Sequence, residues 1–256
     1  MSAPKRRRRR SINSVLPSLL TLASCCAGLT AVRYAIDGEI ARALVFILAA
    51  GLLDGLDGTV ARWLKATSQF GGELDSLADF VAFGVAPGLI VYFSIFEALP
   101  PPFKGLAWGA MLLFIMCCCL RLARFNVANL SPDPARKPEP FFRGIPAPAG
   151  GILCLMPLAF LQILPELRYH GTTPLLYISW LIFVGLMMVS SVPTFSPKTL
   201  RVPSQYRITS LLLLLGVVIL AIELPWHVWI GICCLYLGSI PWFALKSRRA
   251  VEQHDA

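Results

Sequence analysis

One acidic stretch decides how this sequence is interpreted. It opens with Asp54-Gly55-Leu56-Asp57-Gly58-Thr59-Val60-Ala61-Arg62 and, after eight further residues, closes with Gly71-Gly72-Glu73-Leu74-Asp75-Ser76-Leu77-Ala78-Asp79. Five of the 14 acidic residues of the chain lie in this stretch, whose ends fall at the edges of two apolar segments. Carboxylates are rare at such places unless they have a chemical task. The stretch is therefore the first candidate for a functional site.

The composition around this stretch is that of a membrane protein. Hydrophobic residues make up 56% of the chain and charged residues only 14%, with a mean hydropathy of +0.68. A soluble domain has about 25% charged residues. Long apolar runs predict an all-α integral membrane protein with about eight transmembrane helices. We expect them at approximately 15–32, 40–57, 75–96, 104–122, 145–164, 174–192, 208–223 and 226–245.

The distribution of basic residues predicts the orientation in the membrane. Six consecutive basic residues, Lys5 to Arg10, precede the first apolar segment and are typical of a tail that faces anionic membrane lipids. Nucleic-acid binding is the alternative for such a run, but no other basic patch with interleaved aromatics supports it. With both termini in the cytoplasm, 19 of the 23 Lys and Arg residues lie on the cytoplasmic side. The other four are Arg33, Arg42, Lys104 and Arg168. We expect a multi-pass protein of the cell (inner) membrane with a cytoplasmic site.

The spacing of the aspartates brings them together. Asp54 and Asp57 are three residues apart, and Asp75 and Asp79 are four apart, so each pair lies on one face of a helix. The basic loop between the pairs is expected to be cytoplasmic, which makes the two helices a hairpin. The two acidic faces therefore meet at the same depth.

Such a meeting of carboxylates needs positive charge. Two like charges about 4 Å apart repel by roughly 4 kcal/mol at an effective dielectric near 20, and each acid within a membrane helix adds up to about 3 kcal/mol. Arg62 neutralises at most one of them. Carboxylates without nearby His or Cys favour Mg²⁺ or Mn²⁺ over Zn²⁺, and four of them are enough to hold two divalent ions.

Small residues surround the aspartates and leave room for a phosphate. Arg62 is a suitable bidentate donor to phosphate oxygens. The alternative interpretation is tight helix packing by small residues, with an arginine that reaches the membrane surface. The small residues concerned are Gly55, Gly58, Ala61 and Gly71.

These residues match at every position the signature D-x2-D-G-x2-A-R-x8-G-x3-D-x3-D, and the chain resembles the CDP-alcohol phosphotransferase family. The resemblance implies a six-helix membrane core, a two-metal site, a CDP-linked lipid substrate, CMP as leaving group and a homodimer. It implies that Asp54, Asp57 and Asp75 bind metal, and that Asp79 is the general base and also close to a metal. Residues assigned to CDP-lipid binding on this basis are Gly58, Ala61, Arg62, Ser68, Gly71 and Thr21.

The apolar runs, the basic segments and this resemblance together suggest four segments. Residues 1–14 form a basic cytoplasmic or interfacial segment, and residues 15–207 form the membrane core. Residues 208–245 form a C-terminal transmembrane hairpin, and residues 246–256 form a cytoplasmic tail.

The acceptor alcohol is indicated by residues outside the signature. Three stretches, Ser76–Pro87, Arg121–Asn126 and Phe142–Pro148, resemble bacterial and archaeal phosphatidylserine synthases within the family. The second begins just before a polar loop expected at 126–143. Arginine is suited to clamp the carboxylate of serine, and an asparagine is suited to bind its ammonium or orient its hydroxyl. The serine-binding candidates are Arg121, Arg124, Asn126 and Arg143; topogenic charge or lipid headgroup contact is the alternative for the arginines.

The expected reaction is transfer of the phosphatidyl group from CDP-diacylglycerol to the hydroxyl of L-serine, giving phosphatidylserine and CMP. The alternatives within the same chemistry are glycerol 3-phosphate, inositol phosphate or choline as acceptor. A divalent metal transporter is the alternative of another class, but transporters usually place acids near the bilayer midplane in repeated broken helices, whereas here they gather at one edge.

Overall fold

The computed structural model describes most of the apolar part of the chain. The described residues are 15–66, 68–101, 103–130, 142–169, 173–194, 215–217 and 219–252. The basic segment 1–14, the centre of the polar loop after residue 130 and the segment 195–214 lie outside them, so the predictions that fall there stay predictions.

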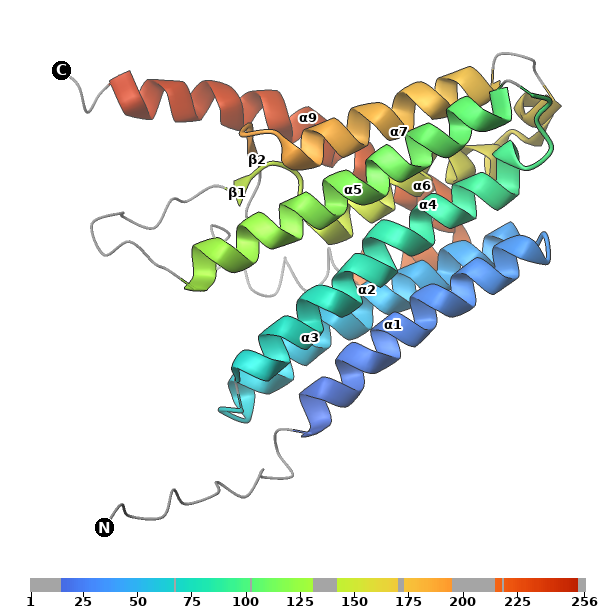
Figure 1. Ribbon diagram of the computed structural model, residues 1–256. Coiled ribbons are helices and arrows are strands. Elements are labelled where there is room, and N and C mark those ends of the chain that lie inside the picture. Colours follow the sequence, from blue (N-terminus) through green and yellow to red (C-terminus); the bar gives the residue numbers. More distant parts are fainter. Residues whose placement is uncertain are drawn as a thin grey trace, which may run out of the picture.

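Helices make up nearly all of the described chain (Figure 1). One unbroken helical run, Gln69–Phe96, contains α3 to η3. In chain order the elements are α1 (Val15–Ile36), α2 (Ile40–Trp63), α3 (Gln69–Asp79), η2 (Phe80–Val85), α4 (Ala86–Val91), η3 (Tyr92–Phe96), α5 (Phe103–Leu130), β1 (Phe142–Arg143), α6 (Ala147–Ile163), η4 (Pro165–Tyr169), α7 (Thr173–Val189), β2 (Pro193–Thr194) and α9 (Pro225–Glu252).

Four of these helical segments are long and apolar enough to cross a membrane. They are Val15–Ile36, Ile40–Trp63, Gln69–Phe96 and Phe103–Ala128, and the shorter apolar helices α6 and α7 follow them. The first six predicted spans therefore coincide with helices, and the chain is a multi-pass, helical membrane protein. Half of the seventh predicted span lies outside the described residues, and its described residues, 215–217 and 219–223, are helical. The count of eight and the C-terminal hairpin stay predictions.

Several helix ends differ from the predicted ones. Helix α5 continues to Leu130, so Asn126 lies in a helix and the prediction of a loop from residue 126 was wrong. The reason is that no proline occurs from Phe103 to Ser131, and proline is what disfavours helix at and before itself. Helix α9 continues to Glu252, past the predicted boundary at residue 245, because lysine and arginine are good helix formers and suit a helix C-terminus.

The bundle has the helix run from α3 to α4 at its centre. Helices α1 and α2 lie along one side of it and α5 along another, with α7 beyond α5 and α6 packed behind (Figure 1). The centre is tightly packed: an added Cβ at Gly28 would lie 2.9 Å from the Cα of Ala82, and one at Gly151 would lie 2.9 Å from the carbonyl oxygen of Phe83. Small residues at such contacts let membrane helices approach closely. This packing fixes the helix immediately after Asp79.

The segment η2 is a π-helical stretch that directly follows Asp79. Pro87, in the first turn of α4, has no N–H to donate to the preceding turn, and prolines and π-turns are common causes of local distortion in long helices. π-turns are frequent at functional sites. Here the distortion separates the acidic α3 from the buried, apolar α4.

Two tryptophans fix α6 to its neighbours. Pro157 interrupts the hydrogen bonding inside α6, which leaves the carbonyl of Leu153 without its usual partner four residues on. The indole N–H of Trp180 in α7 donates to this oxygen at 2.7 Å, and that of Trp229 in α9 donates to the carbonyl of Ile152 at 3.2 Å. Helices α6, α7 and α9 are therefore joined by directed bonds as well as by packing.

A two-residue antiparallel pair, β1 with β2, was not predicted and lies where α6 begins. Gly144 follows β1 with φ of +73°, and a Cβ there would lie 2.7 Å from the carbonyl oxygen of Ser190. The Gly144 N–H donates to Val192 O at 2.8 Å, and the Thr194 hydroxyl donates to Gly144 O at 2.8 Å. This clamp holds the chain before α6 against the end of α7.

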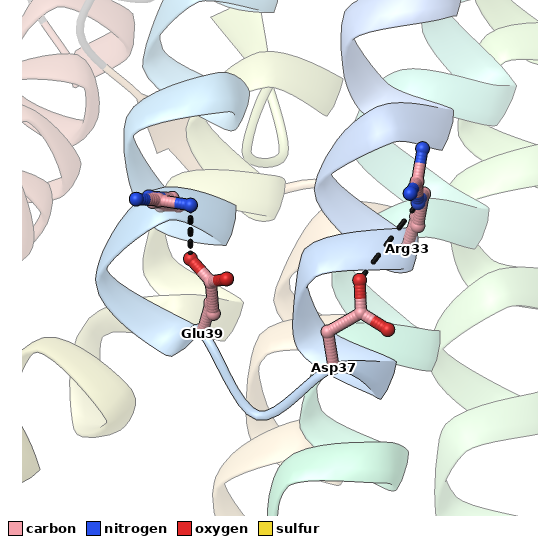
Figure 2. Close-up of polar contacts among 4 residues, drawn as sticks. Arg33, Asp37 and Glu39 are labelled. Carbon is pink, nitrogen blue, oxygen red and sulfur yellow. Dashed lines mark ion pairs between the residues drawn. The ribbon is translucent and has the colours of Figure 1, made fainter.

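The turn that joins α1 to α2 carries the two ion pairs found among the described residues. In the turn between these helices Arg33 pairs with Asp37 at 3.8 Å, and Arg42 pairs with Glu39 at 2.6 Å (Figure 2). These side chains are largely exposed, so the pairs contribute little to stability. They mark a polar end of the bundle remote from the acidic residues, because Asp54 and Asp57 lie toward the other end of α2 and Asp75 and Asp79 lie in α3.

Candidate active site

The four aspartates come from two adjacent helices joined by a short connection. Asp54 and Asp57 lie in the last part of α2, and Asp75 and Asp79 lie in α3. Carboxylate oxygens of Asp54, Asp57 and Asp75 lie within 4.8 Å of one another. The side chain of Asp79 lies against that of Asp54. The two acidic faces therefore meet, as their spacing predicts.

Asp57 is the most enclosed member of the cluster. Its side chain is 5% exposed, and the hydroxyl of Thr21 in α1 donates to its Oδ2 at 2.5 Å. Thr21 is itself 5% exposed. Helix α1 therefore supports the acidic cluster through one buried hydroxyl. This contact was missed by sequence reasoning, which assigned Thr21 to the CDP-lipid alone.

The charge of the cluster fits a divalent cation. The described residues form ion pairs at the α1–α2 turn, and neither pair involves the four aspartates. Arg62 instead directs its Nη2 to the hydroxyl of Thr59 at 3.4 Å. Three converging carboxylates without a cationic partner match the oxygen ligands that Mg²⁺ and Mn²⁺ prefer, so the donor set at this place fits the metal that the sequence predicts.

A pocket of about 270 Å³ adjoins the cluster. Asp57 and Asp75 form part of its wall, so the pocket and the cluster share two carboxylates. The wall also includes all six residues assigned from sequence to the CDP-lipid, namely Thr21, Gly58, Ala61, Arg62, Ser68 and Gly71. The structure thus brings together residues from α1, α2, the connection and α3.

Two glycines of this pocket, Gly71 and Gly58, have different roles. Ser68 precedes α3, and its hydroxyl accepts a hydrogen bond from the N–H of Gly71 at 3.0 Å, which is a helix N-cap. A Cβ at Gly71 would lie 3.2 Å from the Ser68 hydroxyl oxygen and crowd the cap. A Cβ at Gly58 would meet no protein atom within 4 Å. Gly58 therefore leaves open space in the pocket, whereas Gly71 relieves a contact.

Two of the arginines assigned to serine binding, Arg121 and Arg124, lie in the C-terminal part of α5 and face the end of α7. Arg121 is 9% exposed and its Nε donates to the carbonyl of Ile145, while Nη1 of Arg124 donates to the carbonyl of Val189 at 2.8 Å. Both line a second pocket of about 340 Å³, which we call the arginine pocket. Arg121 is also within electrostatic range of Asp79. The backbone of Arg143 lies in β1, and its side chain is outside the described part of the chain.

The other side of the arginine pocket is formed by Ser190 and Ser191, at and after the end of α7. Sequence reasoning missed both. A serine pair at the end of an apolar span was the available signal, but such residues are common at membrane boundaries.

Asn126 is placed differently from the arginines. Its amide oxygen accepts a hydrogen bond from the Ser76 hydroxyl at 2.9 Å, and its amide nitrogen donates to Glu73 at 3.4 Å. Both partners lie in α3, on either side of Asp75 in the sequence. In this structure Asn126 therefore links α5 to the helix that carries two of the aspartates, and it does not line the arginine pocket.

Fold and site together define a multi-pass membrane protein built around a carboxylate centre. A family model described as CDP-alcohol phosphatidyltransferase matches residues 14–192. The chain belongs to this family, as the aspartate signature indicates.

Three curated relatives are similar over most of the chain, and each is named CDP-diacylglycerol–serine O-phosphatidyltransferase. The protein from Mycobacterium bovis is 37% identical over 98% of this chain and 85% of its own length. The protein from Mycobacterium leprae is 39% identical over 97% and 80%, respectively. The protein from Helicobacter pylori is 35% identical over 90% and 92%. The similarity therefore extends beyond the aspartate motif into the C-terminal part.

Proposed function

We propose that this chain transfers the phosphatidyl group of CDP-diacylglycerol to the hydroxyl of L-serine and releases CMP. The observation that carries the proposal is the convergence of four aspartates beside a pocket that collects all six residues assigned to the CDP-lipid. Similarity to relatives named for this reaction supports serine as the acceptor.

The CDP-lipid binds, in this proposal, in the pocket beside Asp57 and Asp75. Arg62 at the pocket wall donates to phosphate oxygens, and the open space at Gly58 admits the phosphate to the helix backbone. Asp54, Asp57 and Asp75 hold the divalent cation. When bound there, the cation supplies positive charge that offsets the charge of the pyrophosphate and of the departing CMP.

The acceptor reacts by direct in-line attack. Asp79 accepts the proton of the serine hydroxyl, the hydroxyl oxygen forms a bond to the lipid-bearing phosphorus, and the bond from that phosphorus to the CMP oxygen breaks. The arginine pocket holds the serine carboxylate through Arg121 and Arg124. Arg121 suits this task because it is buried, lines the arginine pocket and lies within electrostatic range of Asp79, the proposed base.

The membrane arrangement is part of the proposal. The acidic cluster, the basic tail at 1–14 and the C-terminal end lie on the cytoplasmic side, where serine and the cytidine headgroup are available. The core extends over residues 15–207, which is supported by the family match to 14–192. We further propose a homodimer, which light scattering of the detergent-solubilised protein tests.

An acceptor assay tests the function. Purified protein in detergent is supplied with CDP-diacylglycerol, Mn²⁺ or Mg²⁺, and one acceptor at a time: L-serine, glycerol 3-phosphate, inositol phosphate or choline. We expect CMP release with serine alone. Release only with another acceptor would refute the assignment.

The variant Asp79→Asn tests the role of the base in the same assay. We expect it to lose CMP release while it retains part of its Mn²⁺ binding, since Asp54, Asp57 and Asp75 remain. Turnover near the wild-type rate would show that Asp79 is not the base.

A further inference from the structure

The ammonium group of serine has no partner in the arrangement proposed above. Arg121 and Arg124 take the carboxylate, and Asp79 takes the proton of the hydroxyl. Asn126, whose amide suited the ammonium on sequence grounds, bonds to α3 and does not line the arginine pocket. An ammonium group has only N–H donors and needs acceptors, which an arginine side chain cannot supply. The acceptors must therefore come from another wall of the pocket.

That wall is the C-terminal end of α7. The described residues that line the arginine pocket include no acidic side chain, and its wall beyond the two arginines contains residues 188–191. The last carbonyls of a helix have no partner within the helix and carry a partial negative charge. This end of α7 therefore favours a cation, just as the arginines of α5 favour an anion.

A chain of hydrogen bonds fixes Ser190 relative to Arg121. Nε of Arg121 donates to the carbonyl of Ile145, and the N–H of Ile145 donates to the carbonyl of Met187 at 3.2 Å. The Ser190 hydroxyl donates to the same Met187 carbonyl at 2.8 Å. The carbonyl of the residue before Ser190 accepts from Nη1 of Arg124, also at 2.8 Å. Ser190 is therefore held in place in the wall that faces both arginines.

The direction of the Ser190 hydroxyl decides what it recognises. Its hydrogen is engaged by the Met187 carbonyl, so the hydroxyl oxygen presents only its lone pairs to the pocket. Such an oxygen accepts a hydrogen bond from an ammonium group and has no hydrogen left for a carboxylate. Ser190 is also half-buried, and hydrogen bonds gain strength where water is partly excluded. The arginine pocket thus has a donor side on α5 and an acceptor side at the end of α7.

We propose that Ser190 is a specificity-determining residue whose hydroxyl oxygen binds the ammonium group of the acceptor, so that the arginine pocket recognises a zwitterion. This inference rests on the proposed function, in which serine is the acceptor. It explains how the pocket discriminates against an acceptor such as glycerol 3-phosphate, whose anionic group suits the arginines but which has no amino group for the other side.

The test compares serine with an analogue that lacks the amino group. 3-Hydroxypropanoate keeps the carboxylate and the hydroxyl, and it is titrated as a competitor of serine in the CMP-release assay at saturating CDP-diacylglycerol and Mn²⁺. The variants are Ser190→Ala, which removes the hydroxyl, and Ser190→Thr, which keeps it. In Ser190→Ala the Met187 carbonyl retains its bond from Ile145, so no buried acceptor is left unpaired. The thermal unfolding midpoint of each variant is recorded.

Ser179→Ala is the matched control. The Ser179 hydroxyl also donates to the carbonyl three residues earlier, that of Leu176, at 2.9 Å. It lies in the same helix but does not line the arginine pocket. The control therefore loses the same kind of hydroxyl without touching the proposed ammonium site.

We expect Ser190→Ala to raise the KM for serine about tenfold, the size of a hydrogen bond to a charged group. Its inhibition constant for 3-hydroxypropanoate and its unfolding midpoint should stay near wild type. Ser190→Thr should restore the KM for serine, and Ser179→Ala should change none of these values.

Three results would overturn the proposal. One is an unchanged serine KM in Ser190→Ala, and another is an equal rise for serine and 3-hydroxypropanoate, which would mean that the substitution disturbs the whole pocket. The third is a wild-type protein in which 3-hydroxypropanoate does not compete with serine, because separate donor and acceptor sides predict that it does. CMP release that requires an acceptor other than serine would refute the proposed function and the ammonium site together, whereas serine-dependent release with any of the three results refutes the ammonium site alone.

Discussion

The hydrogen bond from Thr21 to Asp57 makes the sharpest prediction about the acidic cluster. Thr21→Val replaces the hydroxyl with a methyl group of similar size, so that a buried carboxylate loses its donor at 2.5 Å while the packing of α1 is kept. Hydrogen bonds to charged groups are worth about 1.5–3 kcal/mol, and each 1.4 kcal/mol corresponds to a factor of ten. We therefore expect the Mn²⁺ concentration required for half-maximal rate to rise about 10- to 100-fold. Loss of a residue that hydrogen-bonds to a metal ligand typically has an effect of this size.

The assay is CMP release over a Mn²⁺ titration at saturating substrates, with direct Mn²⁺ binding followed by electron paramagnetic resonance. Thr21→Ser should restore the wild-type titration because it keeps the hydroxyl. Ser24→Ala is the matched control: Ser24 lies one turn further along α1, is equally buried, and donates to the carbonyl of Ala50 at 2.8 Å instead of to a carboxylate.

Two outcomes would refute this reasoning. One is a Thr21→Val enzyme with a wild-type Mn²⁺ titration and a raised KM for CDP-diacylglycerol, which would make Thr21 a substrate ligand only. The other is an equal shift in Ser24→Ala, which would show that any lost hydroxyl in α1 disturbs the cluster.

Three further predictions concern packing, helix placement and the metal. Gly151→Ala should lower the unfolding midpoint in detergent, because overpacking against the Phe83 backbone costs about 1–3 kcal/mol. Gly105→Ala is the control and should leave the midpoint unchanged, because a Cβ there meets nothing within 4 Å. Equal midpoints for the two variants would contradict this prediction. Asn126→Ala should lower kcat, because it removes the hydrogen bonds that join α5 to α3. The KM for serine should stay within about twofold of wild type. A rise in the serine KM alone would indicate that Asn126 contacts the serine directly. Chelation should abolish CMP release, with recovery on adding Mn²⁺ or Mg²⁺ and not Zn²⁺; activity that survives chelation would exclude the metal.

The acidic cluster was predictable because it depends on local spacing. Intervals of three and four residues put each aspartate pair on one helical face. Because the connection between α2 and α3 is short, the two helices are neighbours and the two acidic faces lie close together. The apolar runs likewise predicted the first six helices, because membrane length sets a minimum that few other segments of the chain satisfy.

Features that depend on distant residues were not predictable in this way. The Thr21–Asp57 bond joins residues 36 positions apart, and the bond from Trp229 in α9 to the carbonyl of Ile152 in α6 joins residues 77 positions apart. Asn126 was assigned to the serine site from the resemblance of the stretch Arg121–Asn126 and from the chemistry of its amide group. Its hydrogen bonds to Ser76 and Glu73 in α3 join distant parts of the chain and were not predicted.

The clamp formed by β1 and β2 shows the same limit. Each strand has only two paired residues, which is too short to give a periodic pattern in the sequence. The positive φ of Gly144 beside them is likewise seen in the structure and not in the sequence.

The division of the site between α2–α3 and the later helices has a consequence for how the protein is made. All four aspartates and the pocket residues beside them lie before residue 80, in contacts between neighbouring helices that a chain emerging from the ribosome completes early. Arg121 and the clamp at Gly144 are synthesised later, in that order. A nascent chain that has inserted only its first three spans should therefore already capture Mn²⁺, while its ability to select an alcohol is acquired last.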